Sequence, residues 1–160
     1  MSGQKNVKIS SVKLSLYVLA YIKLAYMLTY LLKSWYMDEY YYPCTLEELQ
    51  KVIEFYKEFI EKEHVKYIVD RFDCDDYAKL FSAIASALLK KNSIGIAIGK
   101  LYLIENGEKV FLGYHAWNIA LVLNNKQQIE ILFIEPQTQE TFKPNRTTDN
   151  FYYELIAVIW

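Results

Sequence analysis

The sequence has few of the residues that build cross-linked scaffolds or flexible linkers. Two cysteines, three prolines and five glycines occur among its 160 residues. Two cysteines are too few for a disulfide framework, and no stretch rich in proline or glycine divides the chain. Because 53% of the residues are hydrophobic, we expect residues 1–160 to form a single domain around one core.

A surplus of charge of one sign is also missing. Lysine and arginine number 18 against 19 aspartates and glutamates, for a formal net charge of -1. Proteins that bind nucleic acid gather positive charge on one face, so we expect no nucleic-acid partner. The first residues are polar and lead into no secretion signal. Together with the low cysteine count, this predicts a cytoplasmic protein.

The chain also lacks an uninterrupted apolar run that would suit a membrane span. Residues 9–37 are rich in leucine and tyrosine and predict a long apolar N-terminal helix, but Lys13, Lys23 and Lys33 divide this segment. A lysine in the middle of a span is costly, so we expect no membrane insertion, and a membrane-anchored form is the weaker alternative. The helix can instead pack on the rest of the domain or on a second copy of itself, which would give a homo-oligomer.

Helical signals dominate the first part of the chain. Thr45, followed three residues later by Glu48, forms a capping box that predicts a helix to about residue 63. Asp73 and Asp76 repeat the capping pattern and predict a helix to about residue 91. This places Cys74 in the first turn of the later helix.

Strand signals dominate the second part of the chain. Asn106-Gly107 between two β-branched runs is a strong hairpin signal, and a second hairpin is expected around residues 124–126. Helices followed by antiparallel strands describe an α+β domain, with N-terminal helices packed on a C-terminal antiparallel sheet. The expected strands cover residues 94–104, 110–114, 115–123, 128–134 and 151–160.

The second hairpin brings a histidine and a glutamate together. If its loop is residues 124–126, paired positions have numbers that sum to 250, and His115 lies opposite Glu135. Directly opposed residues have Cβ atoms about 4.5 to 5.5 Å apart, which suits an imidazole whose ring N–H is held by a carboxylate. The inference holds for any register in which the numbers of paired residues have an even sum, because an odd sum places the two side chains on opposite faces of the sheet.

Cys74 is the candidate nucleophile of this constellation. The N-terminal end of a helix and a neighbouring protonated histidine both favour a thiolate, and the backbone amides of the first turn can stabilise an oxyanion. The acids at positions 73, 75 and 76 oppose a thiolate, so its activation must come mainly from His115. Taken singly, a cysteine, a histidine and a glutamate at such positions are most often structural or solvated. Their joint pattern indicates a thiol site.

Three short motifs carry a family resemblance. Asp73-Cys74-Asp75-Asp76-Tyr77-Ala78 resembles the cysteine motif of the bacterial transglutaminase-like cysteine peptidases, and His115-Ala116-Trp117 is similar to their histidine motif. Ile134-Glu135-Pro136 is similar to the Asp-Pro that ends the next strand in that family, although the acid here is one methylene longer. The resemblance implies a papain-like/transglutaminase-like fold with its catalytic core at residues 70–140.

The resemblance also implies an activity. It suggests a thiol-dependent hydrolase of peptide, isopeptide or other amide bonds, with a peptide or protein substrate, in which Cys74 attacks, His115 moves the proton and Glu135 orients the imidazole. Acyl transfer to an amine stays open. The alternative is a catalytically inactive module of the same fold that self-associates or binds a partner through its N-terminal helix.

Flanking residues complete the expected site. Trp117 and Tyr114 are expected to line the substrate cleft, with core packing as the alternative role of aromatic residues in strands. No cofactor is required by the proposed chemistry. Some relatives bind calcium through the acids beside the cysteine, and the matching positions here are Asp73 and Asp75, although helix capping is the simpler role of such acids.

Overall fold

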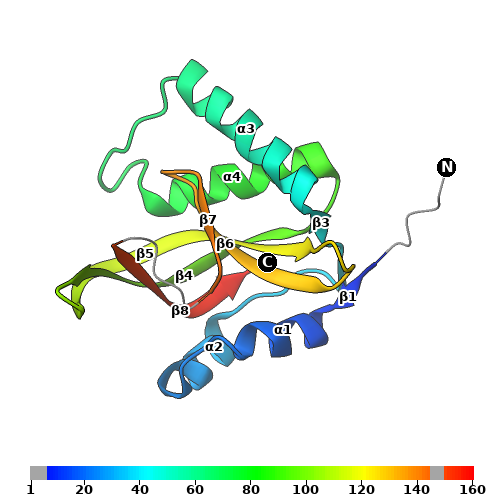
Figure 1. The fold of residues 1–160 in the computed structure, drawn as a ribbon, viewed down its shortest axis with the longest axis horizontal. Helices are drawn as coiled ribbons and strands as arrows, with labels where there is room; N and C mark the ends of the chain where they lie inside the picture. The colour runs from blue at the N-terminus through cyan, green and yellow to red at the C-terminus, as the bar shows by residue number, and fades with distance from the viewer. Residues whose placement is uncertain (1–6, 145–149) are drawn as a thin grey trace.

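A curled β-sheet with helices on two sides forms the body of the computed structural model (Figure 1), which describes residues 7–144 and 150–160. In chain order the helices come before the strands of the main sheet, so the architecture is α+β. The helices are α1 (Ser11–Leu19), the 3-10 helix η1 (Leu24–Tyr26), α2 (Met27–Lys33), α3 (Leu46–Lys62) and α4 (Cys74–Leu89). The strands are β1 (Ile9–Ser10), β2 (Tyr40–Tyr41), β3 (Cys44–Thr45), β4 (Ile94–Glu105), β5 (Glu108–Leu123), β6 (Ile129–Glu135), β7 (Glu140–Phe142) and β8 (Phe151–Ile159).

The main sheet has the strand order β7-β6-β5-β4-β8, with neighbours antiparallel, and β3 pairs in parallel with the end of β5. β1 and β2 form a separate two-stranded ribbon. The helices α3 and α4 cover one side of the sheet, while α1 and α2 lie along the other (Figure 1). Each layer buries its own apolar cluster against the sheet, and burial of such surface is the main force that holds the layers together.

The N-terminal segment is not the single long helix that its composition predicts. α1 ends at Leu19, and the chain turns back through η1 into α2. A straight helix over residues 9–37 would be about 40 Å long at 1.5 Å per residue, and its far end would leave the sheet. Folding back lets Val18 and Tyr30 both become fully buried. Self-association through a long helix therefore loses its structural basis, and among the described residues no helix is both long and apolar enough to cross a membrane.

The capping box at Thr45 begins α3 as the sequence predicts. The Thr45 hydroxyl accepts from the Glu48 backbone N–H at 3.1 Å, and the Glu48 carboxylate accepts from the Thr45 N–H at 2.8 Å. The short strands that precede α3 are not predicted, because two-residue strands are too brief to show an alternating pattern. β3 nevertheless places Cys44 beside Val122 in the sheet.

The hairpin at Asn106-Gly107 is confirmed. Glu105 pairs with Glu108 across it, and both turn residues have positive φ, 51° and 81°, as the tight turn between twisted strands requires. The two strands expected at 110–114 and 115–123 are in fact one continuous strand, β5. A bulge beside Leu101 bends this strand pair instead of ending it.

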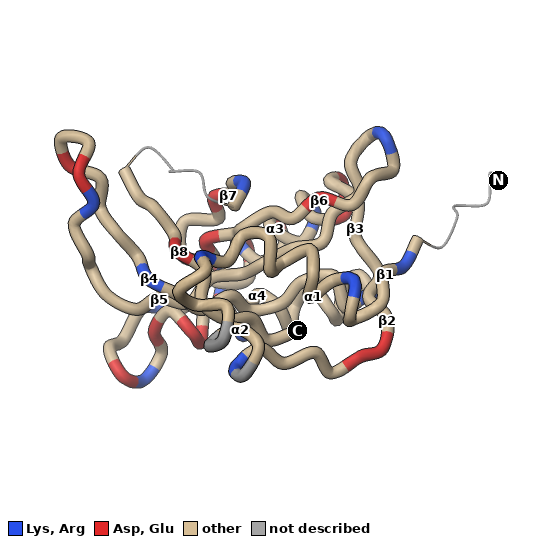
Figure 2. The backbone as a smooth tube through the Cα atoms, turned by 90° about the horizontal axis from the view of Figure 1, so that it is seen from below, with Lys and Arg blue, Asp and Glu red and all other residues tan. Residues whose placement is uncertain are grey.

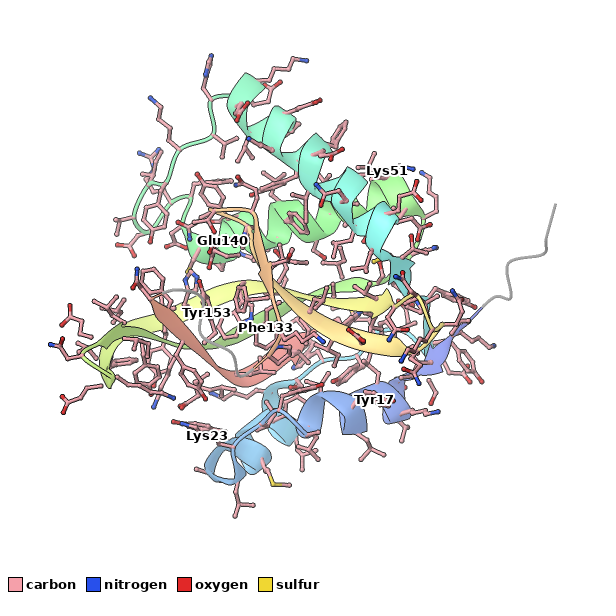
Figure 3. All side chains as sticks on the ribbon, in the orientation of Figure 1. Tyr17, Lys23, Lys51, Phe133, Glu140 and Tyr153 are labelled. Carbon is pink, nitrogen blue, oxygen red and sulfur yellow. The ribbon has the colours of Figure 1, made fainter. Side chains whose placement is uncertain are left out.

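The edges of the sheet approach each other through aromatic side chains. The rings of Phe142 on β7 and Tyr153 on β8 have centroids 4.6 Å apart, although these strands lie at opposite ends of the strand order. Figure 3 shows Tyr153 and Phe133 in the interior of the molecule. The sheet is therefore curled, and residues on its concave side, Trp117 among them, pack against one another in the core.

Charges of both signs are interspersed along the described part of the backbone (Figure 2). Lys51 pairs with Glu47 one helical turn away at 2.7 Å, and Lys91 pairs with the more distant Glu48 at 2.6 Å. Exposed pairs such as Lys51 with Glu47 contribute little to stability. They do balance charge locally, so that neither sign gathers over a broad face of these residues.

Candidate thiol site

Cys74 is the first residue of α4, as the sequence predicts. The backbone N–H of Asp73, the residue before the helix, donates to the Asp76 carboxylate at 3.4 Å, and the Tyr77 N–H donates to the Asp73 carbonyl at 3.1 Å. The thiol is free and partly buried. It therefore lies at the positive end of a sixteen-residue helix, where the backbone dipoles favour a negative charge.

Polar anchors fix α4 to the sheet. The buried side chain of Asn118 on β5 donates from Nδ2 to the carbonyl of Ala78 at 2.9 Å and to that of Gly95 at 3.1 Å. One turn further along the helix, Ser82 Oγ donates to the carbonyl of Ile94 at 2.8 Å. Because these bonds tie the first half of α4 to β4 and β5, the helix tip cannot slide along the sheet without losing buried hydrogen bonds.

His115 lies between Cys74 and Glu135. Its Nε2 is 2.7 Å from Glu135 Oε2, and both side chains are largely buried, with 11% and 5% of their surface exposed. The Cys74 side chain lies near the imidazole and acts with Glu135 to raise its pKa. With Nε2 engaged by the carboxylate, Nδ1 is the ring atom available to the thiol. A sulfur, an imidazole and a carboxylate thus lie together at the tip of α4.

The register that brings His115 to Glu135 differs from the predicted one. The hairpin pairs Leu123 with Ile129 and Asn118 with Ile134, so the numbers of paired residues sum to 252 instead of 250. The sum is still even, and His115 and Glu135 remain on the same face, but as diagonal rather than directly opposed neighbours. Diagonal Cβ atoms are about 7 to 8 Å apart, a separation that the additional methylene of a glutamate helps to bridge.

The Glu135 carboxylate has further hydrogen-bond donors. Its Oε1 accepts from the Gln137 backbone N–H at 3.2 Å, and its Oε2 accepts from the Tyr153 hydroxyl at 3.1 Å. The turn after β6 is closed by the Gln139 N–H, which donates to the Glu135 carbonyl at 2.7 Å. A buried carboxylate needs such partners to remain charged, and together they hold the acid that faces the imidazole.

The surroundings of His115 favour its protonated form. Burial by itself would lower the pKa of His115, but the hydrogen bonds with Cys74 and Glu135 and their negative charges raise it to about 9. The imidazole is therefore protonated at neutral pH. An imidazolium beside a sulfur stabilises the thiolate, which is the nucleophilic form of cysteine.

Trp117 and Tyr114, the two residues expected to line a cleft, lie in different environments. Trp117 is fully buried, and its ring lies 6.1 Å from the imidazole of His115 in a stacked arrangement. It therefore supports the histidine from within the core and offers no surface to a ligand. Tyr114 is 73% exposed, but it precedes His115 in the strand and so points to the opposite face. Neither residue forms a wall around the thiol.

The acids beside Cys74 form a tight group. Carboxylate oxygens of Asp73, Asp75 and Asp76 lie within 4.8 Å of one another. Lys79 forms ion pairs with Asp75 and, at 3.3 Å, with Asp76, while hydrogen bonding to Asp75 raises the pKa of Asp73. Oxygen ligands of this kind suit calcium, but a lysine already balances two of the acids. Calcium binding by Asp73 and Asp75 stays a prediction.

Sequence reasoning missed two residues of the site. Asn118 was visible as a lone polar residue in an otherwise apolar strand, a pattern that marks a buried hydrogen-bonding group. Tyr153 left no such signal. Its contact with Glu135 depends on the curl of the sheet and on a bulge between β4 and β8, and neither can be read from local sequence.

Two solved structures resemble the whole domain. PSL1a in complex with E64 matches with a TM-score of 0.64 and 16% identity, over 96% of this chain and 50% of that one. A Polyporus squamosus lectin bound to a human-type influenza-binding epitope, Neu5Aca2-6Galb1-4GlcNAc, matches with a TM-score of 0.60 and 16% identity, over 96% and 49%. The chain shares its fold with half of a lectin. No protein-family model matches it, and no curated protein does.

These matches correct the expectations that rested on the family resemblance. Both are structures of the Polyporus squamosus lectin, so the papain-like/transglutaminase-like fold and membership of that peptidase superfamily are wrong. The same finding contradicts a thiol-dependent hydrolase of peptide or amide bonds, a peptide or protein substrate, and an inactive module of that family. The motifs misled because a run of three to six residues records the surroundings of one side chain and not the connections between elements.

Proposed function

We propose that this domain is a nucleophilic thiol centre, in which Cys74 forms a covalent bond with an electrophilic carbon of its ligand. His115 stabilises the thiolate as an imidazolium and then supplies its proton, while Glu135 holds the imidazole. One observation carries the proposal. A single buried imidazole has a carboxylate oxygen 2.7 Å from its Nε2, and the Cys74 side chain lies near enough to raise its pKa.

The second cysteine supports the proposal by contrast. Cys44 is fully buried, and its S–H donates to the carbonyl of Leu121 at 3.4 Å. Burial raises the pKa of the Cys44 thiol to about 11, so only about one molecule in ten thousand carries a thiolate there at pH 7. Cys44 is thus a packing residue, and it serves as an internal control for Cys74.

Alkylation kinetics test the proposal. At pH 7 we expect iodoacetamide to modify Cys74 at least 100-fold faster than Cys44, because only Cys74 combines access with an adjacent imidazolium. In this step the sulfur bonds to the methylene carbon as iodide leaves. Mass spectrometry of the two cysteine peptides over time gives both rates. Equal, slow modification of both cysteines would rule out an activated thiol.

E64, the compound in the PSL1a complex, is the second probe. A thiolate opens its epoxide by bonding to one ring carbon while the C–O bond breaks, and the resulting alkoxide takes a proton from the imidazolium. We expect one E64 molecule on Cys74 and none in Cys74→Ser. Absence of an adduct, alongside fast iodoacetamide labelling, would show that the thiol is reactive but that its surroundings do not accept this ligand.

Glycan binding is a second candidate function. It is favoured by the likeness to a lectin bound to Neu5Aca2-6Galb1-4GlcNAc. The β4–β5 hairpin of this chain displays Tyr114 and Phe111, which are 73% and 50% exposed, with ring centroids 6.0 Å apart. Lys100 Nζ lies 5.8 Å from the Phe111 ring. Aromatic rings stack on the apolar faces of sugars, and a lysine can pair with the carboxylate of Neu5Ac.

Titration with the trisaccharide tests the glycan candidate independently of the thiol. If the hairpin binds it, the amide resonances of Phe111 and Tyr114 shift on addition of Neu5Aca2-6Galb1-4GlcNAc, and Tyr114→Ala weakens binding. Tyr17→Ala, at an exposed tyrosine on α1, is the matched control. Unchanged spectra at millimolar sugar would exclude the hairpin as a glycan site and would leave the thiol proposal untouched.

A cytoplasmic location and a single functional domain stay proposals. Both cysteines are free thiols, and a reducing compartment would keep them so. The chain spans about half the length of the structures that it matches. The activity of a whole protein of that size is thus not carried over to this domain.

A further inference from the structure

The phenol of Tyr153 occupies a distinctive place beside the thiol centre. Tyr153 is only 4% exposed, and its hydroxyl donates to Glu135 Oε2 at 3.1 Å. The same oxygen lies 2.7 Å from His115 Nε2. One carboxylate oxygen is therefore shared by a phenol and an imidazole, which approach it from different strands.

The ring of Tyr153 is locked in place on several sides. Its centroid lies 5.9 Å from that of His115, 5.3 Å from that of Trp117 and 4.6 Å from that of Phe142. Burial and the neighbouring Glu135 both raise the pKa of Tyr153 above its ordinary value. The phenol consequently keeps its proton throughout the physiological range and acts as a fixed hydrogen-bond donor.

Sharing an oxygen has an electrostatic consequence for the imidazole. While His115 is protonated, it compensates the charge of Glu135, and the hydrogen bond from Tyr153 contributes less to the stability of the carboxylate. Once His115 loses its proton, the buried carboxylate depends on its remaining donors, Tyr153 and the Gln137 N–H. A donor that stabilises the deprotonated state more than the protonated one lowers the proton affinity of the imidazole.

We propose that Tyr153 is a positioning residue that sets the proton affinity of His115 through the Glu135 oxygen they share. The proposal rests on the proposed function, since it explains how the thiol centre is tuned. The phenol limits the proton affinity of the imidazole. The imidazolium of His115 can therefore give up its proton to a departing or newly formed anion after Cys74 has reacted.

Other ionisable groups around this centre come from three further elements. Cys74 on α4 faces the imidazole directly. Tyr56 on α3 is buried, which raises its pKa, and the charge of Glu135 raises it further. Glu140 on β7 acts on Tyr153. None of these groups bonds to the shared oxygen, so the effect of Tyr153 can be separated from theirs by a change that removes only its hydroxyl.

Tyr153→Phe makes that change and keeps the ring. We expect the imidazole of His115, followed by NMR with isotope-labelled histidine, to titrate about one unit higher in Tyr153→Phe than in the native chain, since a hydrogen bond to a charged group is lost. The exposed His64 is the other histidine, and His64→Gln assigns its signal. Tyr152→Phe, on the same strand with its ring against Tyr102, is the matched control and should leave the titration unchanged.

A kinetic readout accompanies the titration. Opening of the E64 epoxide needs the imidazolium, so its rate should fall above the pKa of His115, and this fall should move upward by the same amount in Tyr153→Phe. An unchanged or lowered titration of His115 would overturn the role of Tyr153. The NMR result does not depend on Cys74 being reactive, whereas an unreactive Cys74 in the native chain would overturn the proposed function by itself.

Discussion

The two cysteines lie next to helix starts with the same local chemistry, yet their environments differ. Both Cys44 and Cys74 stand beside a residue whose backbone N–H bonds to an acid three positions later. Cys44 falls one residue before its capping residue, in strand β3, where its thiol is buried against the carbonyl of Leu121. Cys74 falls one residue after its capping residue, in the first turn of α4.

A shift of two positions relative to the cap therefore changes what a cysteine can do. The residue before the cap is still extended and packs into the sheet, where burial opposes ionisation. The residue after the cap joins the helix dipole and meets side chains from other elements. The reactivity expected of Cys74 comes from His115 and Glu135, which lie 41 and 61 positions away in the chain.

The largest effect is expected from raising the pH, which removes the charge of His115 that distinguishes the surroundings of Cys74 from those of Cys44. Because the pKa of His115 is raised from about 6.5 to about 9, its protonation stabilises the fold fully below pH 6.5, and this contribution is lost as the pH rises through 9. The loss amounts to about 3 kcal/mol at most. Urea unfolding at pH 6 and pH 9.5 measures it, and His115→Gln should show a much smaller difference between these values. An equal pH dependence in both proteins would contradict the assignment.

Removing the imidazole of His115 should have the next largest effect. In His115→Gln we expect the alkylation rate of Cys74 at pH 7 to fall by about 100-fold, because the amide carries no positive charge and cannot exchange a proton. The rate at Cys44 should not change. His64→Gln, at the exposed histidine after α3, provides the control. A fall of less than threefold in His115→Gln would mean that the helix alone activates the thiol.

Neutralising the carboxylate should have an intermediate effect. Glu135→Gln keeps the length of the side chain but removes the charge that stabilises the imidazolium, and we expect the alkylation rate of Cys74 to fall by about tenfold. Glu108→Gln, at an exposed residue at the start of β5, should change it little. If Cys74 is alkylated at the same rate in Glu135→Gln and in the control variant, the bond between His115 and Glu135 does not contribute to the reactivity of the thiol.

The acids that flank Cys74 should contribute least. Lys79→Met removes the ammonium group that pairs with Asp75 and Asp76, leaving three carboxylates near the thiol, and we expect the alkylation rate to fall about twofold, since these groups are exposed and screened. If Asp73 and Asp75 bind calcium, millimolar calcium should restore the rate. The same salt concentration with magnesium is the control, and no recovery would argue against a calcium site.

Much of the fold and of the site follows from the sequence because it depends on local chemistry. The caps at Thr45 and Asp73 and the turn at Asn106-Gly107 are each specified by adjacent residues. The even register between His115 and Glu135 follows from the alternation of side chains along strands. Placing His115 and Glu135 on one face therefore needed no knowledge of the remaining fold.

The remaining features depend on contacts between distant parts of the chain. Residues 9–37 contain an apolar pattern that fits one long helix as well as two short ones, and only the shape of the sheet decides between them. Lys23 interrupts this pattern because it pairs with the buried Glu154 on β8, a partner 131 positions away. The curl that brings Tyr153 to Glu135 is likewise a property of the whole sheet.

The most direct test of the account is the titration of His115 in the native chain and in Cys74→Ser. The thiol and the carboxylate together raise the pKa of this imidazole to about 9, so removing the sulfur should lower it by about one unit or more, while Cys44→Ser should leave it unchanged. The same pKa for His115 in the native chain and in Cys74→Ser would show that the sulfur and the imidazole do not interact, and would contradict the thiol centre.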